Sequence, residues 1–124
     1  MKKLKKIDGA CAPYALKFLS GLPDNQVYDI CEFNGYQGST GMEEHEFIAA
    51  AKDMGIRLRR INLKKKNLYR SKLRMFIKHH SLGTYLIYTD SHLFSVRNGI
   101  VVDPLNDKSP GLNRLVTNAW WVYN

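Results

Sequence analysis

The dipeptide Asn98-Gly99 lies between two runs rich in β-forming residues, "HLFSVR" (92–97) and "IVVD" (100–103). An Asn-Gly pair favours the left-handed backbone of a two-residue turn, so the pattern predicts an antiparallel hairpin. Side chains alternate faces along a strand, and counting outward from the turn puts His92 and Asp103 on one face. They become diagonal neighbours about 7 Å apart at the backbone, within side-chain reach. The acid could accept the imidazole Nδ1–H and fix the tautomer.

The rest of the chain divides into helical patterns first and strand patterns later. Asp24 is expected to be an N-cap, and Thr40 with Glu43 has the spacing of a capping box. We expect one α+β domain over residues 1–124, with N-terminal helices packed on a C-terminal antiparallel sheet. The predicted helices cover 11–21, 22–33, 40–55 and 68–80, and the predicted strands cover 56–63, 83–89, 92–97, 100–104 and 115–124.

Composition excludes several classes of protein. No apolar run approaches the length of a membrane span, and the Lys-rich start lacks the apolar segment of an export signal. Two cysteines are too few for a disulfide framework, and no Cys/His cluster has the spacing of a zinc site. We therefore expect a cytoplasmic protein without a membrane partner, and we expect neither a metal nor an organic cofactor.

Cys11 stands at the predicted start of the first helix, with Pro13 in its first turn. At that place unpaired N–H groups and the helix dipole favour a thiolate, and a nearby imidazolium would lower the thiol pKa further. A cysteine at a helix start, followed by His92 and then Asp103 on a sheet, predicts a catalytic triad. The alternative is that Cys11 is a buried structural thiol, which is the role we expect for Cys31.

The order and placement of these residues resemble the papain-like cysteine peptidase superfamily. The resemblance is closest to small uncharacterised phage papain-like proteins and to bacteriocin-leader peptidase domains. The matching pieces cover most of the chain: Cys11, Ala15-Leu16, Val27-Tyr28-Asp29, Gly38-Ser39, His92, Asn98-Gly99 and Asp103. One departure is Lys5, which stands where these enzymes usually carry a glutamine as the second oxyanion donor; Lys5, Lys6 or another residue could take that place.

The resemblance implies a cysteine hydrolase, a peptidase or amidase, with Cys11 as nucleophile, His92 as base and acid, and Asp103 as the group that orients His92. It also implies a phage-encoded protein that acts in the host cytoplasm on a peptide or a host or phage protein. Deamidases and transferases share the same triad, so the residues predict acyl chemistry rather than one substrate.

Positive charge is concentrated in the middle of the chain. The net charge is +8, and no acidic residue occurs between Asp53 and Asp90. Such a block favours an acidic protein or nucleic acid as partner, although a solvated face is the simpler alternative. Tyr69 and Phe76 have core-like spacing and do not predict a stacking platform. The alternative function is thus a catalytically degenerate papain-like binding module, for which the candidate contact residues are Lys64, Lys65, Lys66, Arg70 and Arg74.

Overall fold

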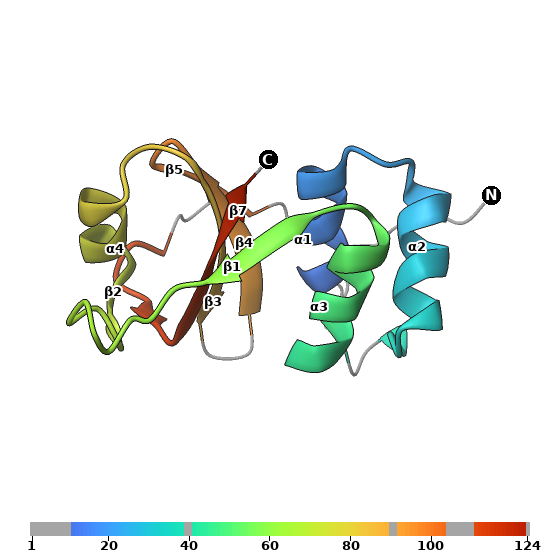
Figure 1. Ribbon diagram of the computed structural model, residues 1–124, viewed down its shortest axis with the longest axis horizontal. Helices are drawn as coiled ribbons and strands as arrows, with labels where there is room; N and C mark the ends of the chain where they lie inside the picture. The colour runs from blue at the N-terminus through green and yellow to red at the C-terminus, as the bar shows by residue number, and fades with distance from the viewer. Residues whose placement is uncertain (1–10, 39–40, 90–91, 104–110, 124) are drawn as a thin grey trace.

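A computed structural model describes residues 11–38, 41–89, 92–103 and 111–123. A five-stranded antiparallel sheet stands between two layers of helix (Figure 1). Its strand order is β1-β7-β3-β4-β5, and a two-stranded sheet pairs β2 with β6. The α+β class predicted from the sequence is confirmed. The strands are β1 (Arg57–Arg60), β2 (Ser71–Lys72), β3 (Thr84–Thr89), β4 (His92–Arg97), β5 (Ile100–Val102), β6 (Leu115–Val116) and β7 (Asn118–Tyr123).

Three helices cover one face of the large sheet: α1 (Cys11–Ser20), α2 (Asp24–Phe33) and α3 (Glu44–Asp53). Leu16 of α1, Leu93 of β4 and Trp120 of β7 belong to the buried cluster on this side. Burying this apolar surface is the main force that holds the helical layer to the sheet. None of the helices in the described part of the chain is long and apolar enough to cross a membrane.

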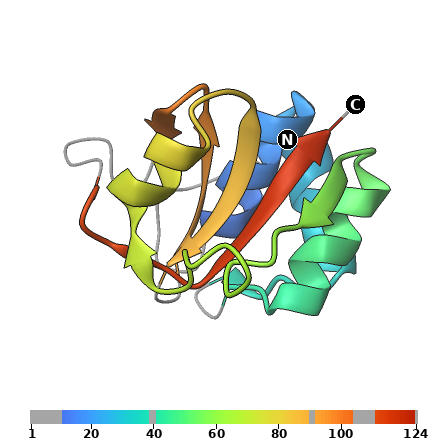
Figure 2. The same cartoon turned by 60° about the vertical axis from the view of Figure 1, so that its left-hand side comes forward.

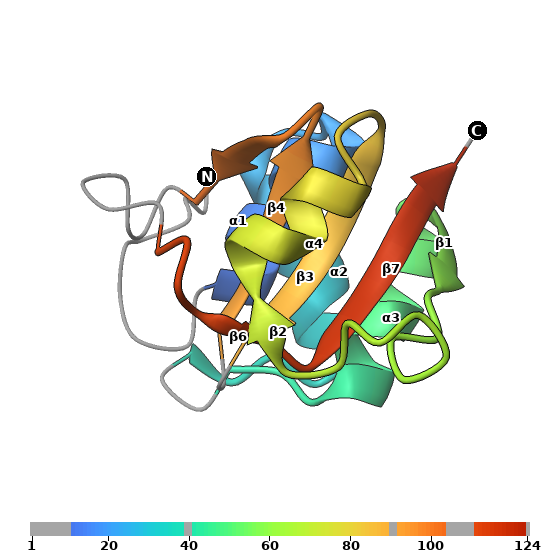
Figure 3. The same cartoon turned by 90° about the vertical axis from the view of Figure 1, so that its left-hand side faces the viewer.

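The fourth helix, α4 (Leu73–His79), lies over the opposite face of the sheet (Figures 2 and 3). Phe76 of α4 is fully buried in a second cluster with Phe94 and Val96 of β4. Side chains of β4 therefore alternate between two cores, with Leu93 on one side and Phe94 on the other.

Two helix starts differ from the sequence-based expectation. Asp24 is the first residue of α2, and Pro23, held in an extended conformation, is its N-cap. The carbonyl of Pro23 accepts the Val27 N–H at 3.1 Å, which completes the first turn. At α3 the capping box consists of Glu43 and Glu46, because the helix begins at Glu44. Thr40 lies outside the described residues.

The predicted hairpin is confirmed. Asn98 and Gly99 have φ values of 50° and 79°, as the tight turn requires, and Arg97 pairs with Ile100. The Asn98 side chain also stabilises the turn, because its Oδ1 accepts the Gly83 N–H at 2.9 Å. The β4–β5 ladder ends, among the described residues, at Ser95 paired with Val102, so Asp103 lies just beyond it.

Candidate active site

The structure brings Cys11, His92 and Asp103 together, as the sequence predicted. Cys11 is the first residue of α1 and is half-buried. Pro13 sits in the first turn, where its fixed φ suits a helix and its missing N–H would have had no helical partner. The helix start therefore presents its cysteine toward the first residue of β4, His92, and the two side chains are hydrogen-bonded.

Several groups act on the Cys11 thiol in opposite directions. Burial alone would raise its pKa. The hydrogen bond with His92, the backbone N–H of Leu93, the charge of His92 and the N–H of Ala12 oppose that effect. Their sum holds the pKa of Cys11 below its ordinary value of 9.0. All four opposing effects, which come from His92, Leu93 and Ala12, stabilise the thiolate rather than the thiol.

His92 contacts both other members of the candidate triad. Its Nε2 lies 2.7 Å from Oδ2 of Asp103. The pKa of His92 is raised from 6.5 to about 9. The hydrogen bond to Asp103 is the largest cause and the hydrogen bond to Cys11 is the next, whereas burial opposes the rise. The pKa of the thiol falls and that of the imidazole rises, and both shifts favour a thiolate–imidazolium pair.

The Asp103 carboxylate is buried, with a side chain only 4% exposed. Burial raises its pKa, but the hydrogen bond and charge of His92 and those of Arg114 outweigh burial, so the pKa of Asp103 lies below 3.8. Arg114 Nη1 donates to the same Oδ2 at 3.2 Å. A buried carboxylate with two cationic donors stays ionised, which keeps it an acceptor for the imidazole.

The Phe94 ring packs against two of the residues that contact Asp103. The His92 ring stacks on Phe94 with centroids 5.6 Å apart, and the Arg114 guanidinium lies 5.3 Å from the same ring centre. Phe94 itself is 1% exposed and packed in the core under α4. One rigid aromatic ring thus fixes the positions of both groups that bind Asp103.

Two details of the site differ from the sequence analysis. The ring nitrogen that bonds Asp103 is Nε2, whereas Nδ1 was predicted. Nε2 is the atom farther from the backbone, and a diagonal neighbour requires that longer reach. The other difference is Arg114, which sequence reasoning missed because no local pattern connects it with Asp103. The sequence showed only that an arginine follows Asp103 in the chain, which does not by itself predict a contact between them.

The second cysteine has the structural role expected of it. Cys31 is fully buried in the core between α2 and its neighbours, and burial raises its pKa to about 12. The two thiols of the chain are therefore shifted in opposite directions. Among residues 11–38, 41–89, 92–103 and 111–123, no group of three metal-ligating side chains comes together. Lys5 and Lys6, which were considered as second oxyanion donors, lie outside the described residues.

The structure places the predicted basic contact residues on two consecutive elements, the loop between β1 and β2 and the helix α4. Lys64, Lys65 and Lys66 are exposed in the loop between β1 and β2, and Arg70 is exposed near its end. Arg74 instead lies on α4, where its guanidinium donates twice to Asn113 Oδ1, at 3.1 and 2.8 Å. Four of the five residues thus lie in one exposed loop, and the fifth lies on the helix that follows it.

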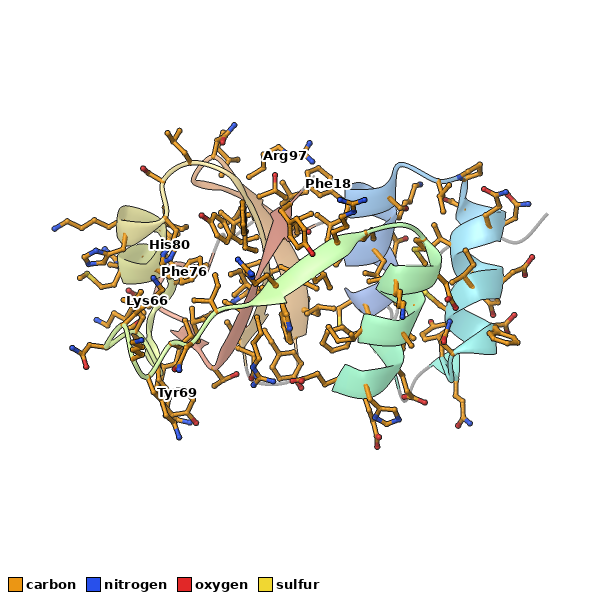
Figure 4. All side chains as sticks on the ribbon, in the orientation of Figure 1. Phe18, Lys66, Tyr69, Phe76, His80 and Arg97 are labelled. Carbon is orange, nitrogen blue, oxygen red and sulfur yellow. The ribbon has the colours of Figure 1, made fainter. Side chains whose placement is uncertain are left out.

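The two aromatic residues near the basic block have different environments. Phe76 of α4 is buried against the sheet, as predicted, and stacks on His80 with centroids 4.3 Å apart. Tyr69 is 44% exposed, so its predicted core position is wrong (Figure 4). The reason is that α4 begins only at Leu73, and Tyr69 remains in the preceding loop.

Comparison with known proteins adds no assignment. No protein-family model matches the sequence, and neither a curated protein nor a solved structure matches it significantly.

Proposed function

We propose that this protein is a papain-like cysteine hydrolase that cleaves an amide or peptide bond. The observation that carries the proposal is the continuous hydrogen-bonded series from Cys11 through His92 to Asp103. A thiolate, an imidazolium that holds its proton, and a buried carboxylate that orients the imidazole are the groups that acyl transfer through sulfur needs.

The proposed reaction uses each of these groups in turn. The Cys11 sulfur attacks the carbonyl carbon, and the oxyanion that forms accepts a hydrogen bond from the backbone N–H at the start of α1. The C–N bond then breaks, and the amine leaves with the proton of His92. His92 next removes a proton from water, which attacks the thioester. The C–S bond breaks, so that the carboxylic acid departs and the thiolate returns.

Asp103 and Arg114 have supporting roles in this scheme. Asp103 holds His92 through Nε2, which leaves the other ring nitrogen for the thiol. Arg114 donates its hydrogen bond to the carboxylate and acts as a positioning residue through it. The charge pattern alternates from thiolate to imidazolium to carboxylate to guanidinium, so each group stabilises the charged form of the next.

Alkylation of the thiols tests the proposal. Iodoacetamide should modify Cys11 rapidly near about pH 6, well below the range of an ordinary thiol. Cys31 is an internal control, because burial should protect it until denaturant is added. His92→Ala should abolish the low-pH reaction of Cys11, with mass spectrometry as the readout. Reaction of Cys11 like a free cysteine in both proteins would leave the binding-module alternative as the better account.

A further inference from the structure

A polar cavity opens at the same end of the sheet as the candidate triad. It has a volume of about 500 Å³ and lies between the end of β1, the loop that follows, and the start of β7. Six polar or aromatic residues line it: Arg60, Asn62, Lys64, Tyr69, Thr117 and Asn118. None of these residues is used by the proposed chemistry.

Strand register fixes the position of the cavity relative to the triad. Thr89 at the end of β3 pairs with His92, and the neighbouring Tyr88 pairs with Asn118 of β7. The carbonyl of Tyr88 also accepts both the N–H and the hydroxyl of Thr117, each at 3.1 Å. Adjacent strands lie about 4.8 Å apart, so β7 is about 10 Å and β1 about 14 Å from His92.

That separation suits an extended peptide. A chain in β conformation advances about 3.3 Å per residue, so about three to four residues would connect the thiol with the cavity. A side chain about three to four residues from a scissile bond at Cys11 would therefore be within reach of the cavity.

The lining of the cavity favours a carboxylate. Lys64 has no acidic side chain within ion-pair distance among the residues that the structure describes. Arg60 and Asn118 already bind one carboxylate of the chain itself. Oε2 of Glu44 accepts from Arg60 at 2.9 Å, and its Oε1 accepts from Asn118 at 3.3 Å. The rim thus has the donors that a carboxylate needs, and Glu44 would compete with an incoming one.

The loop that carries Lys64 is held in place by its own contacts. Leu63 and Leu68 are buried, and the Leu68 N–H donates to the Leu63 carbonyl at 2.8 Å. Asn62 Oδ1 accepts the Lys65 N–H at 3.1 Å. Anchoring at both ends restrains the loop before any ligand binds, which lowers the entropic cost of binding.

Tyr69 makes a nucleic acid a poorer fit than a peptide. Single-stranded nucleic acids bind by stacking successive bases on free aromatic faces. Tyr69 is the one aromatic residue that lines this cavity, and the Lys64 ammonium already lies 5.0 Å from its ring centre. The cavity supplies hydrogen-bond donors and a positive charge, and Lys64 already lies over its one lining aromatic ring.

We propose that this cavity is a subsite for an acidic side chain of the polypeptide substrate, three to four residues from the bond that is cut. The inference rests on the proposed function, because the triad defines where the scissile bond lies. It assigns acidic polypeptides as the substrate class.

Fluorescence anisotropy tests the subsite with the Cys11→Ser variant, in which turnover cannot consume the ligand. The probes are a fluorescein-labelled decapeptide of alternating Glu and Gly, its Gln/Gly counterpart, and a labelled single-stranded oligo-dT of ten nucleotides. The Glu peptide should bind more tightly than both. Lys64→Gln should weaken its binding about two- to fivefold, the range of one exposed ion pair, and Glu44→Gln should strengthen it by a similar factor.

Lys78→Gln is the matched control, because it removes the same charge from an exposed position on α4. Equal losses for Lys64→Gln and Lys78→Gln would show attraction by net charge and overturn the subsite, as would tighter binding of oligo-dT. Alkylation of Cys11 in a protein with the native cysteine is measured separately. An ordinary thiol combined with Lys64-dependent peptide binding overturns the hydrolase and retains an acidic-peptide site. A reactive thiol without Lys64 dependence overturns the subsite alone.

Discussion

Nε2 of His92 and Oδ2 of Asp103 lie 2.7 Å apart, although Asp103 has already left the β4–β5 ladder. The carboxylate is therefore oriented by side-chain contacts rather than by strand pairing. Its contacts with His92 and Arg114 hold it in position beyond the end of β5. Changes in these contacts should consequently alter the titration of the site more than the register of the sheet.

Asp103→Asn keeps an acceptor beside His92 and removes the negative charge. The pKa of His92 should fall from about 9 toward 6.5, because Asp103 is the largest cause of its elevation. Two-dimensional ¹H–¹⁵N spectra of the imidazoles, recorded between roughly pH 5 and 10, would measure the shift. His80, which follows α4 and stacks on Phe76, should titrate as in the native protein. An unchanged His92 would contradict the assigned hydrogen bond.

Stability should depend on pH through the same pair. The raised pKa of His92 contributes stability that is fully present below 6.5 and is lost as pH rises through about 9. The lowered pKa of Asp103 contributes stability that is present above 3.8 and is lost as pH falls through the folded-state value. The difference in free energy of unfolding between native protein and Asp103→Asn should thus be largest between 3.8 and 6.5.

Urea titrations at a series of pH values would give that profile. The difference at its maximum should be about 3–5 kcal/mol, the range found when one partner of a buried ion pair is removed. A difference that is constant with pH would show that the substitution acts through packing instead of charge.

Arg114→Met removes a donor to Asp103 while keeping an apolar side chain over Phe94. The pKa of Asp103 should rise, and the protein should lose about 1–3 kcal/mol of unfolding free energy, the range for a hydrogen bond to a charged group. The alkylation rate of Cys11 at low pH should fall less than in His92→Ala, because Arg114 acts through the carboxylate. Arg114→Lys, which retains the charge, should recover part of both losses. Equal effects of Met and Lys would contradict an electrostatic role.

Asn98→Ala tests whether the turn positions the site. Asn98 has φ 50° and accepts the Gly83 N–H, so alanine loses the hydrogen bond and strains the backbone. We expect a loss of about 1–2 kcal/mol, whereas Asn98→Gly, which tolerates this φ, should lose only the bond. Urea unfolding measures the stability, and the pH profile of Cys11 alkylation reports whether Asp103 keeps its place. A larger loss for glycine than for alanine would contradict the backbone argument.

The predictable part of the molecule is the part governed by short-range chemistry. The Asn98-Gly99 turn requires left-handed backbone, and period-two counting from it leads directly to His92 and Asp103. Cys11 was predictable as a helix start because Pro13 follows it in the first turn. In each case the determining residues lie within a few positions of one another.

The features that were not predicted depend on contacts between residues far apart in the sequence. Arg114 meets Asp103 across the segment 104–110, and no periodicity determines where the chain returns. Tyr69 was misplaced because β2 intervenes before α4, and this two-residue strand exists only through its pairing with β6. The cavity beside Lys64 likewise depends on β1 and β7 being neighbours, which only the folded sheet establishes.

The brevity of β5 has a consequence for what this sheet can become. Residues 92–94 of β4 have no partner in β5 among the described residues, and the Leu93 N–H contacts the Cys11 sulfur. An open strand edge ordinarily invites another chain to pair with it. Here the Leu93 N–H is directed to the Cys11 sulfur, so this donor is not available to another strand. If β5 were longer, it would pair with this part of β4 and take the Leu93 N–H as a backbone donor. The Cys11 thiolate would then lose that hydrogen bond, so a longer sheet and a reactive thiol exclude each other at this position.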